Sequence, residues 1–459
     1  MSPLVGRGHY PPFTRARYRA PVTQLARRLT LPDAVVIGLG SMIGAGVFAV
    51  WGPAAAASGG ELFVGLALAA VVAFCNATSS AQLAAEHPGS GGTYLYGRRQ
   101  LGPWWGFLAG WGFVIGKTAS CAAMALTAAS SLVPGPWQRP VAVASVVALA
   151  AVNYRGITRT ARLARVIVAI VLVLLTAAVA ANVASASAVG LLGLPGTPGL
   201  PGTAPTAAGP YGVLQSAGLL FFAFAGYARI ATLGEEVTRP ERTIPRAIVL
   251  ALGLAVALYA LVGASLVAVL GVGRLAVSAT PLVDAAASGV APWLAPLLRI
   301  GGGIAALGAL LALIAGIGRT ALAMAREGDL PRPLAAVHPR FQVPHVAEVT
   351  VASVVCALVL LTDLRGAIGF SSFGVLLYYF VANVAAFTQD AHRRYPRALQ
   401  VLGAALCLVL VATLPWASVA AGVGVFAVGV AYRVVVRRGV RASRASRADG
   451  SDGADGSDG

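Results

Sequence analysis

The chain has 459 residues, of which 58% are hydrophobic and only 11% are charged, and its mean hydropathy is +0.79. Soluble globular domains carry about 25% charged residues, so this composition excludes an ordinary water-soluble surface and indicates a membrane protein. The net charge of +18 raises nucleic-acid binding as an alternative. The chain has no separate basic domain, however, so no nucleic-acid partner is expected.

Apolar runs long enough to cross a lipid bilayer recur along the chain. A membrane helix needs about 20 mostly apolar residues, with a range of about 17–25. The sequence therefore predicts an all-α, polytopic membrane protein with about 12 transmembrane helices. The predicted spans are 33–58, 62–85, 104–131, 140–153, 166–184, 213–235, 247–271, 296–318, 347–362 and 366–389, with two more inside 398–432 that divide at Pro415.

Basic residues are distributed unevenly between the two sides of these spans. With the N-terminus inside, 28 of the 34 Lys and Arg residues lie in inside segments, 4 lie outside and 2 lie within spans. Cytoplasmic loops of membrane proteins carry such an excess. We therefore expect a multi-pass protein of the cell (cytoplasmic) membrane with both termini in the cytoplasm.

The first span contains Gly38, Gly40, Gly44 and Gly46 within nine residues. Glycine costs about 1 kcal/mol relative to alanine inside a helix. A helix-packing face is one interpretation, because small residues let membrane helices approach closely. These glycines cover more than one face, so a local unwinding at mid-membrane depth is the favoured interpretation.

The sixth span has a weaker signal at Phe224-Ala225-Gly226-Tyr227. Its position five helices after the first glycine cluster matters more than the single glycine. Five is an odd number, so a repeat of five helices must be inserted upside down. The sequence predicts inverted repeats over 32–184 and 213–390, with discontinuous first and sixth helices.

The remaining segments flank these repeats. They are an N-terminal cytoplasmic tail at 1–31, a Gly/Pro-rich outside loop at 185–212, two further spans in 391–436, and a disordered cytoplasmic tail at 437–459. The last of these is rich in Ser, Asp and Gly, which is typical of disorder.

Interrupted helices suit the binding of small zwitterions. A break leaves backbone N–H groups of one half-helix and carbonyls of the other unpaired, and membranes tolerate such groups only where they line a cavity or protein. Free N–H groups bind a carboxylate, and free carbonyls bind an ammonium group. Two breaks together predict a receptor for an α-amino acid.

Three ordered motifs resemble a known family. The segment 40–48 (Gly-Ser-Met-Ile-Gly-Ala-Gly-Val-Phe) is similar to the first-helix signature of the amino acid–polyamine–organocation permeases. The segment 88–94 resembles their loop after helix two. Phe224-Ala225-Gly226-Tyr227, with the segment 234–237 and Pro240, is similar to helix six of the cationic amino acid transporter branch.

The resemblance covers roughly 30–435 and implies a LeuT-like 5+5 fold, secondary amino acid transport by alternating access, and a set of site residues. Amides of Gly44, Ala45 and Gly46 would hold the substrate carboxylate, and carbonyls near Met42, Phe222 and Ala225 would hold the ammonium. Ile43, Phe224 and Gly226 complete the implied substrate site. Phe222 and Phe224 become candidate gates, although each ring is equally compatible with ordinary packing.

Lys117 is the only lysine in the chain, and it lies near the middle of the third span. A charge at that depth is costly and is a functional hypothesis by default. Lysine can lose its proton when buried, so proton coupling is one role. A structural lysine that bonds carbonyls is the other. Some sodium-independent relatives place a lysine in helix five, but here 166–184 has no ionisable residue.

Arg229, Glu235 and Glu236 lie at the inner end of the sixth span. If Arg229 faces the cavity, it disfavours cationic substrates. If it pairs with Glu235 or Glu236, it is structural. The two glutamates are candidate inner-gate latches to Arg159, Arg162 or Arg319, or they are solvated charges at a helix end.

The sequence contains no motif for catalysis, a metal or a cofactor. The four cysteines lie in apolar runs without a C-x-x-C pair, which argues against metal ligation and disulfides. A membrane-embedded enzyme, the alternative from another class, would need acidic or His clusters within the spans. An amine, polyamine or amino acid antiporter is the closer alternative. The substrate, the coupling ion and the oligomeric state stay open.

Overall fold

The computed structural model describes residues 29–44, 46–87, 91–133, 135–155, 160–188, 209–231, 233, 237–390 and 393–452. This part of the chain is almost entirely helical, and its one β-bridge joins Leu29 to Val237. The α-helices are α1 (Leu31–Ile43), α2 (Gly46–Ala49), α3 (Trp51–Ser58), α4 (Leu62–Glu86), α5 (Gly92–Gln100), α6 (Pro103–Leu132), α7 (Gln138–Tyr154), α8 (Thr160–Ala188), α9 (Gly209–Phe224), α10 (Ala228–Ala231), α11 (Pro240–Val277), α12 (Pro281–Ser288), α13 (Leu294–Arg326), α14 (His345–Leu361), α15 (Leu364–Phe387), α16 (Arg397–Thr413) and α17 (Trp416–Asp452). Four 3₁₀ turns accompany them, namely η1 (Gly59–Glu61), η2 (Gly135–Trp137), η3 (Ala225–Tyr227) and η4 (Arg332–Ala335).

Within the described residues, nine helical stretches are long and apolar enough to cross a membrane. They are Leu31–Ala49, Trp51–Glu86, Pro103–Leu132, Arg165–Ser187, Gly209–Ala231, Pro240–Val277, Leu294–Arg326, Leu364–Phe387 and Trp416–Arg437. His345–Leu361 and Arg397–Thr413 are apolar but shorter. The chain is therefore a multi-pass membrane protein, and the expectation of 12 crossings stays a prediction.

Helix boundaries follow local sequence signals. Pro103, Pro240 and Pro281 each occupy the first turn of a helix, where the missing N–H has no partner to lose. The Asp363 carboxylate caps α15 by accepting the Gly366 N–H at 2.8 Å, as expected of an N-cap aspartate. Inside α11, Gly271 has φ 67°, a left-handed conformation that glycine adopts readily, and the predicted span also ends there.

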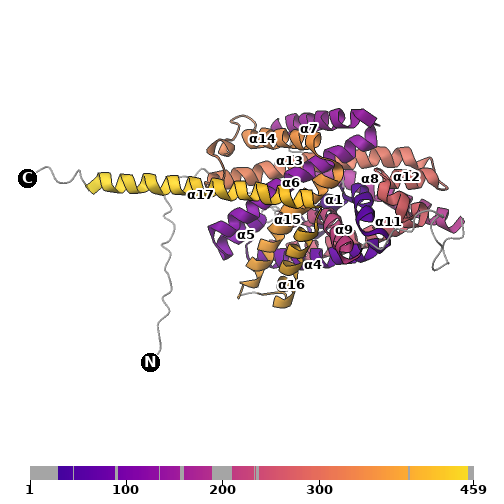
Figure 1. Cartoon of the computed structure of the whole chain (residues 1–459), viewed down its shortest axis with the longest axis horizontal. Coiled ribbons are helices and arrows are strands. Elements are labelled where there is room, and N and C mark those ends of the chain that lie inside the picture. Colours follow the sequence, from indigo (N-terminus) through magenta and orange to yellow (C-terminus); the bar gives the residue numbers. More distant parts are fainter. Residues whose placement is uncertain are drawn as a thin grey trace, which may run out of the picture.

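The bundle is assembled around α6, which runs through its middle (Figure 1). Glycines allow α6 and α15 to approach closely. A Cβ on Gly116 would lie 3.0 Å from the Ser371 carbonyl oxygen, and one on Gly374 would lie 2.6 Å from the Gly112 carbonyl oxygen. Small residues at such a contact are typical of membrane helix packing. This contact turns the next residue of α6, Lys117, toward another neighbour.

The segments between and after the spans differ in part from the expected boundaries. The outside loop expected at 185–212 is shortened by α8 and α9, and residues 189–208 lie outside the described part. The tail expected to be disordered from 437 is helical as far as Asp452, and α17 extends away from the bundle (Figure 1). Residues 1–28 and 453–459 also lie outside the described part.

Candidate functional site

The first helix of the chain is interrupted where the glycines cluster. α1 ends at Ile43, Gly44 has φ −39° and ψ −127°, and helical geometry resumes at Gly46 in α2. Met42, Ile43 and Gly46 are buried. Ala45, an expected carboxylate-binding residue, lies outside the described residues. The segment expected to unwind is therefore discontinuous in the structure.

A second interruption occurs after α9. The α-helix ends at Phe224, the 3₁₀ turn η3 covers Ala225–Tyr227, and a short α10 follows. A change from α-helical to 3₁₀ geometry alters which backbone carbonyls are paired. The carbonyl of Ala225 lies at this change of geometry and becomes available to side chains.

The two interruptions are in direct backbone contact. A Cβ on Gly226 would lie 2.2 Å from the Ser41 carbonyl oxygen and 2.6 Å from the Met42 nitrogen. A Cβ on Gly46 would lie 2.8 Å from the Cα of Ala223. No side chain fits in either gap, so glycine is required for the chain segments to cross here.

Tyr259 of α11 joins both interruptions through its hydroxyl. This buried group contacts the Met42 carbonyl at 2.7 Å and the Ala223 carbonyl at 3.1 Å. One hydroxyl has one proton to donate, so the two carbonyls share it. The Met42 carbonyl, an expected ammonium ligand, therefore already has a protein donor.

Lys117 of α6 contacts the second interruption. Its Nζ donates a hydrogen bond to the Ala225 carbonyl at 3.2 Å, and the side chain is 7% exposed. The Tyr379 hydroxyl contacts the same carbonyl at 3.5 Å. The sequence indicated a position near mid-membrane for Lys117, with bonds to backbone carbonyls as one of its two possible roles. The helix that supplies the carbonyl could not be predicted. The Lys117 ammonium thus occupies a carbonyl, that of Ala225, which was expected to bind the substrate ammonium.

The two candidate gate phenylalanines lie inside the core. Phe224 is fully buried and its ring centroid is 5.0 Å from that of Tyr259. Phe222 is 7% exposed. For Phe224, this packing agrees with the alternative of an ordinary core aromatic, and its role as a gate stays a prediction.

The segment that precedes α1 and the segment that follows α10 are also joined. The Thr238 N–H donates to the Leu29 carbonyl at 2.9 Å, beside the parallel bridge between Leu29 and Val237. Arg229 on α10 is partly buried. Glu235 and Glu236 lie outside the described residues, so the structure does not test the latch expected of them.

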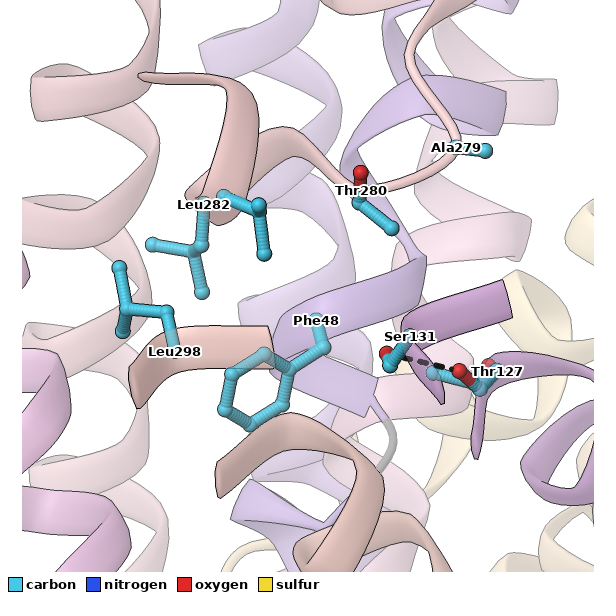
Figure 2. Close-up of a pocket in the computed structure, with 8 residues that line it drawn as sticks. Phe48, Thr127, Ser131, Ala279, Thr280, Leu282 and Leu298 are labelled. Carbon is cyan, nitrogen blue, oxygen red and sulfur yellow. Dashed lines mark hydrogen bonds between the residues drawn. The ribbon is translucent and has the colours of Figure 1, made fainter. Parts of the chain in front are cut away.

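A small hollow lies beside the first interruption. Figure 2 shows Phe48 of α2 beside Ser131 and Thr127 of α6, with Leu282 and Thr280 above the Phe48 ring in this view. Ala279, Val283 and Leu298 complete the lining, and the cavity volume of the hollow is about 10 Å³, which is room for about one water molecule. The α12 segment that borders it connects the seventh and eighth predicted spans, which is a predicted outside position.

Two residues at the interruptions, Tyr259 and Phe48, were not predicted as site residues from the sequence. Tyr259 lies in an uninterrupted apolar run, and no sequence signal separates it from a core aromatic. Phe48 was part of the first-helix motif, and its position two residues after Gly46 could have indicated a place beside the site.

Apolar helices with two interruptions that cross in the core are typical of membrane transport proteins. Residues 29–437 match the amino acid permease family, and the chain belongs to that family. It is 57% identical over 420 residues to an uncharacterized transporter of Mycobacterium tuberculosis. The aligned residues make up 90% of this chain and 93% of that relative.

Relatives with substrates in their names are more distant. The branched-chain amino acid permease BcaP of Bacillus subtilis is 27% identical over 86% of this chain and 90% of its own length. A vacuolar cationic amino acid transporter of Arabidopsis thaliana is 30% identical over 79% of this chain and 59% of its own length. These names disagree on substrate charge, so they do not select one for this chain.

Proposed function

We propose that the protein is a secondary active transporter that carries an amino acid across the cell membrane by alternating access. The observation that carries this proposal is the crossing of two interrupted helices at Gly226 and Gly46, in a chain of the amino acid permease family. Main-chain groups exposed at such a crossing bind a zwitterion without a charged side chain.

In this proposal the chain crosses the membrane 12 times, with both termini in the cytoplasm. The repeats 32–184 and 213–390 are related by inversion, and each contributes one interrupted helix. The contact between α2 and α9 supports a site shared by the two halves. The bond from Thr238 to Leu29 supports concerted movement of their inner ends, since it ties one to the other.

The substrate carboxylate is held by the amides of Gly44, Ala45 and Gly46. The substrate ammonium is held by carbonyls near Met42, Phe222 and Ala225. A carbonyl oxygen has two lone pairs, and the Ala225 carbonyl already accepts from Lys117 and from Tyr379. The ammonium is therefore held by carbonyls close to Ala225 rather than by the Ala225 oxygen itself. The Met42 carbonyl accepts from Tyr259 with one lone pair and from the ammonium with the other.

The route from outside passes the hollow of Figure 2. Phe48 lines this hollow and follows Gly46 of the first interruption by two residues, and its ring packs against Gly302 of α13. We therefore add Phe48 to Phe222 and Phe224 as a gate residue. Energy comes from protons or from exchange, and Lys117 is the coupling candidate for the first.

Uptake into proteoliposomes tests this function. The purified protein should accumulate at least one radiolabelled amino acid from a panel of acidic, neutral and basic members. Comparison of vesicles with and without a pH gradient, and of empty with amino-acid-loaded vesicles, separates proton coupling from exchange. Absence of uptake across the whole panel, with protein that is folded and inserted, would exclude amino acid transport.

A further inference from the structure

Lys117 is a cation held deep between helices by a backbone partner. Its Nζ has three donors, and among the described residues its hydrogen bond goes to the Ala225 carbonyl. The side chain is 7% exposed. Because Gly112 and Gly116 fix α6 against α15, the lysine cannot turn to that side without separating the helices.

The charge of Lys117 has no acidic partner in the described part of the chain. The ion pairs found there join other residues, such as Arg98 with Asp329 and Arg165 with Asp33. The side chain one turn further along α6 is Cys121, a buried thiol. A buried ammonium is costly unless a counter-charge meets it, and a carbonyl dipole compensates only part of that cost.

The position of Lys117 makes a ligand the natural source of that counter-charge. Its acceptor, Ala225, is two residues from Ala223, where the second interruption touches Gly46 of the first. The lysine therefore borders the crossing at which the substrate is proposed to bind. A neutral zwitterion uses its single carboxylate on the amides of the first interruption and leaves Lys117 without an anion.

We propose that Lys117 determines substrate class by binding a second carboxylate, so that the transported amino acid is acidic, of the aspartate and glutamate type. This inference rests on the proposed function. The charge-assisted hydrogen bond between the ammonium and the side-chain carboxylate is stronger than the neutral bonds that leucine could make. A cationic side chain would be repelled by the same lysine.

Competition measured by binding and by uptake tests the proposal. The probes are L-glutamate, L-leucine and L-arginine, added to wild-type protein in proteoliposomes and, in detergent, to a thermal-unfolding assay that does not depend on coupling. Wild-type protein should bind glutamate at least tenfold more tightly than leucine or arginine. Lys117→Met should reduce the glutamate-to-leucine preference at least tenfold, and Lys117→Arg should keep most of it.

The outcomes separate this inference from the function beneath it. A wild-type protein that prefers leucine or arginine to glutamate overturns the acidic substrate class, and that result needs no variant. An equal loss of all three ligands in Lys117→Met also overturns it, since the lysine then serves the common part of every amino acid or the fold. The proposed function itself is overturned if wild-type protein binds and transports no amino acid, neither these three nor any other.

Discussion

The hydroxyl of Tyr259 links the backbone of the two interrupted helices, because it contacts a carbonyl of each one. Tyr259→Phe removes the donor shared by the Met42 and Ala223 carbonyls and keeps the ring that packs on Phe224. A buried acceptor left without a partner costs about 1–3 kcal/mol. We expect a lower midpoint of thermal unfolding in detergent, together with slower amino acid uptake.

Tyr211→Phe is the matched control for this substitution. Tyr211 is 55% exposed, so loss of its hydroxyl should change neither the midpoint nor uptake. If Tyr259→Phe behaves like Tyr211→Phe, the hydroxyl does not hold the interruptions together.

Asp329 is a second residue on which several elements converge. Its carboxylate pairs with Arg98 of α5 and Arg433 of α17, each at 2.8 Å, and Asp329 and Arg433 are both 1% exposed. The Tyr94 hydroxyl donates to it at 3.0 Å. Burial, and secondarily the charge of Asp329, raise the pKa of Tyr94, so this phenol stays protonated and keeps donating at physiological pH.

Asp329→Asn should therefore destabilise the protein strongly. Removal of one partner from a buried ion pair costs about 3–5 kcal/mol, because the remaining charge stays buried. Thermal unfolding of the purified protein measures the loss. Glu327→Gln is the control, since Glu327 is 55% exposed and exposed pairs contribute below about 1 kcal/mol. Similar midpoints for the two variants would exclude a central role for Asp329.

At the scale of whole elements, the contact between η3 and α1 depends on the lack of a side chain at Gly226. Gly226→Ala would place a Cβ 2.2 Å from the Ser41 carbonyl oxygen. That neighbour is backbone, so the two interrupted helices must separate, and overpacking of this kind costs about 1–3 kcal/mol. Uptake should fall at least tenfold while part of the protein still folds.

Gly253→Ala on α11 is the control for this contact. A Cβ there meets nothing within 4 Å, so uptake should be unchanged, and the better helix propensity of alanine should leave stability equal or slightly higher. Full uptake by Gly226→Ala would show that the close crossing is not needed for transport.

The sequence predicted the elements better than their contacts. Apolar runs and Arg-rich boundaries located the helices, because burial in a bilayer demands long runs of one kind. The glycines at 38–46 and Gly226 located both interruptions, because only a strained or closely packed backbone needs them. The Ala225 carbonyl that Lys117 contacts and the Met42 carbonyl that Tyr259 contacts lie 108 and 217 residues away in the sequence, and no local pattern encodes such separations.

On the scale of the whole molecule, the distribution of Arg and Lys predicts how the chain lies in the membrane. In a cysteine-free background, with Cys75, Cys121, Cys356 and Cys407 replaced, single cysteines at Ser2, Thr203 and Ser451 report the side of each segment. Because 28 of 34 basic residues fall on one side of the predicted spans and such segments stay in the cytoplasm, a membrane-impermeant maleimide should label Thr203→Cys in intact cells. Ser2→Cys and Ser451→Cys should react only after permeabilisation.

Reaction of Ser2→Cys and Ser451→Cys on opposite sides would mean an odd number of crossings, and the 12-span arrangement with its two inverted halves would then be wrong.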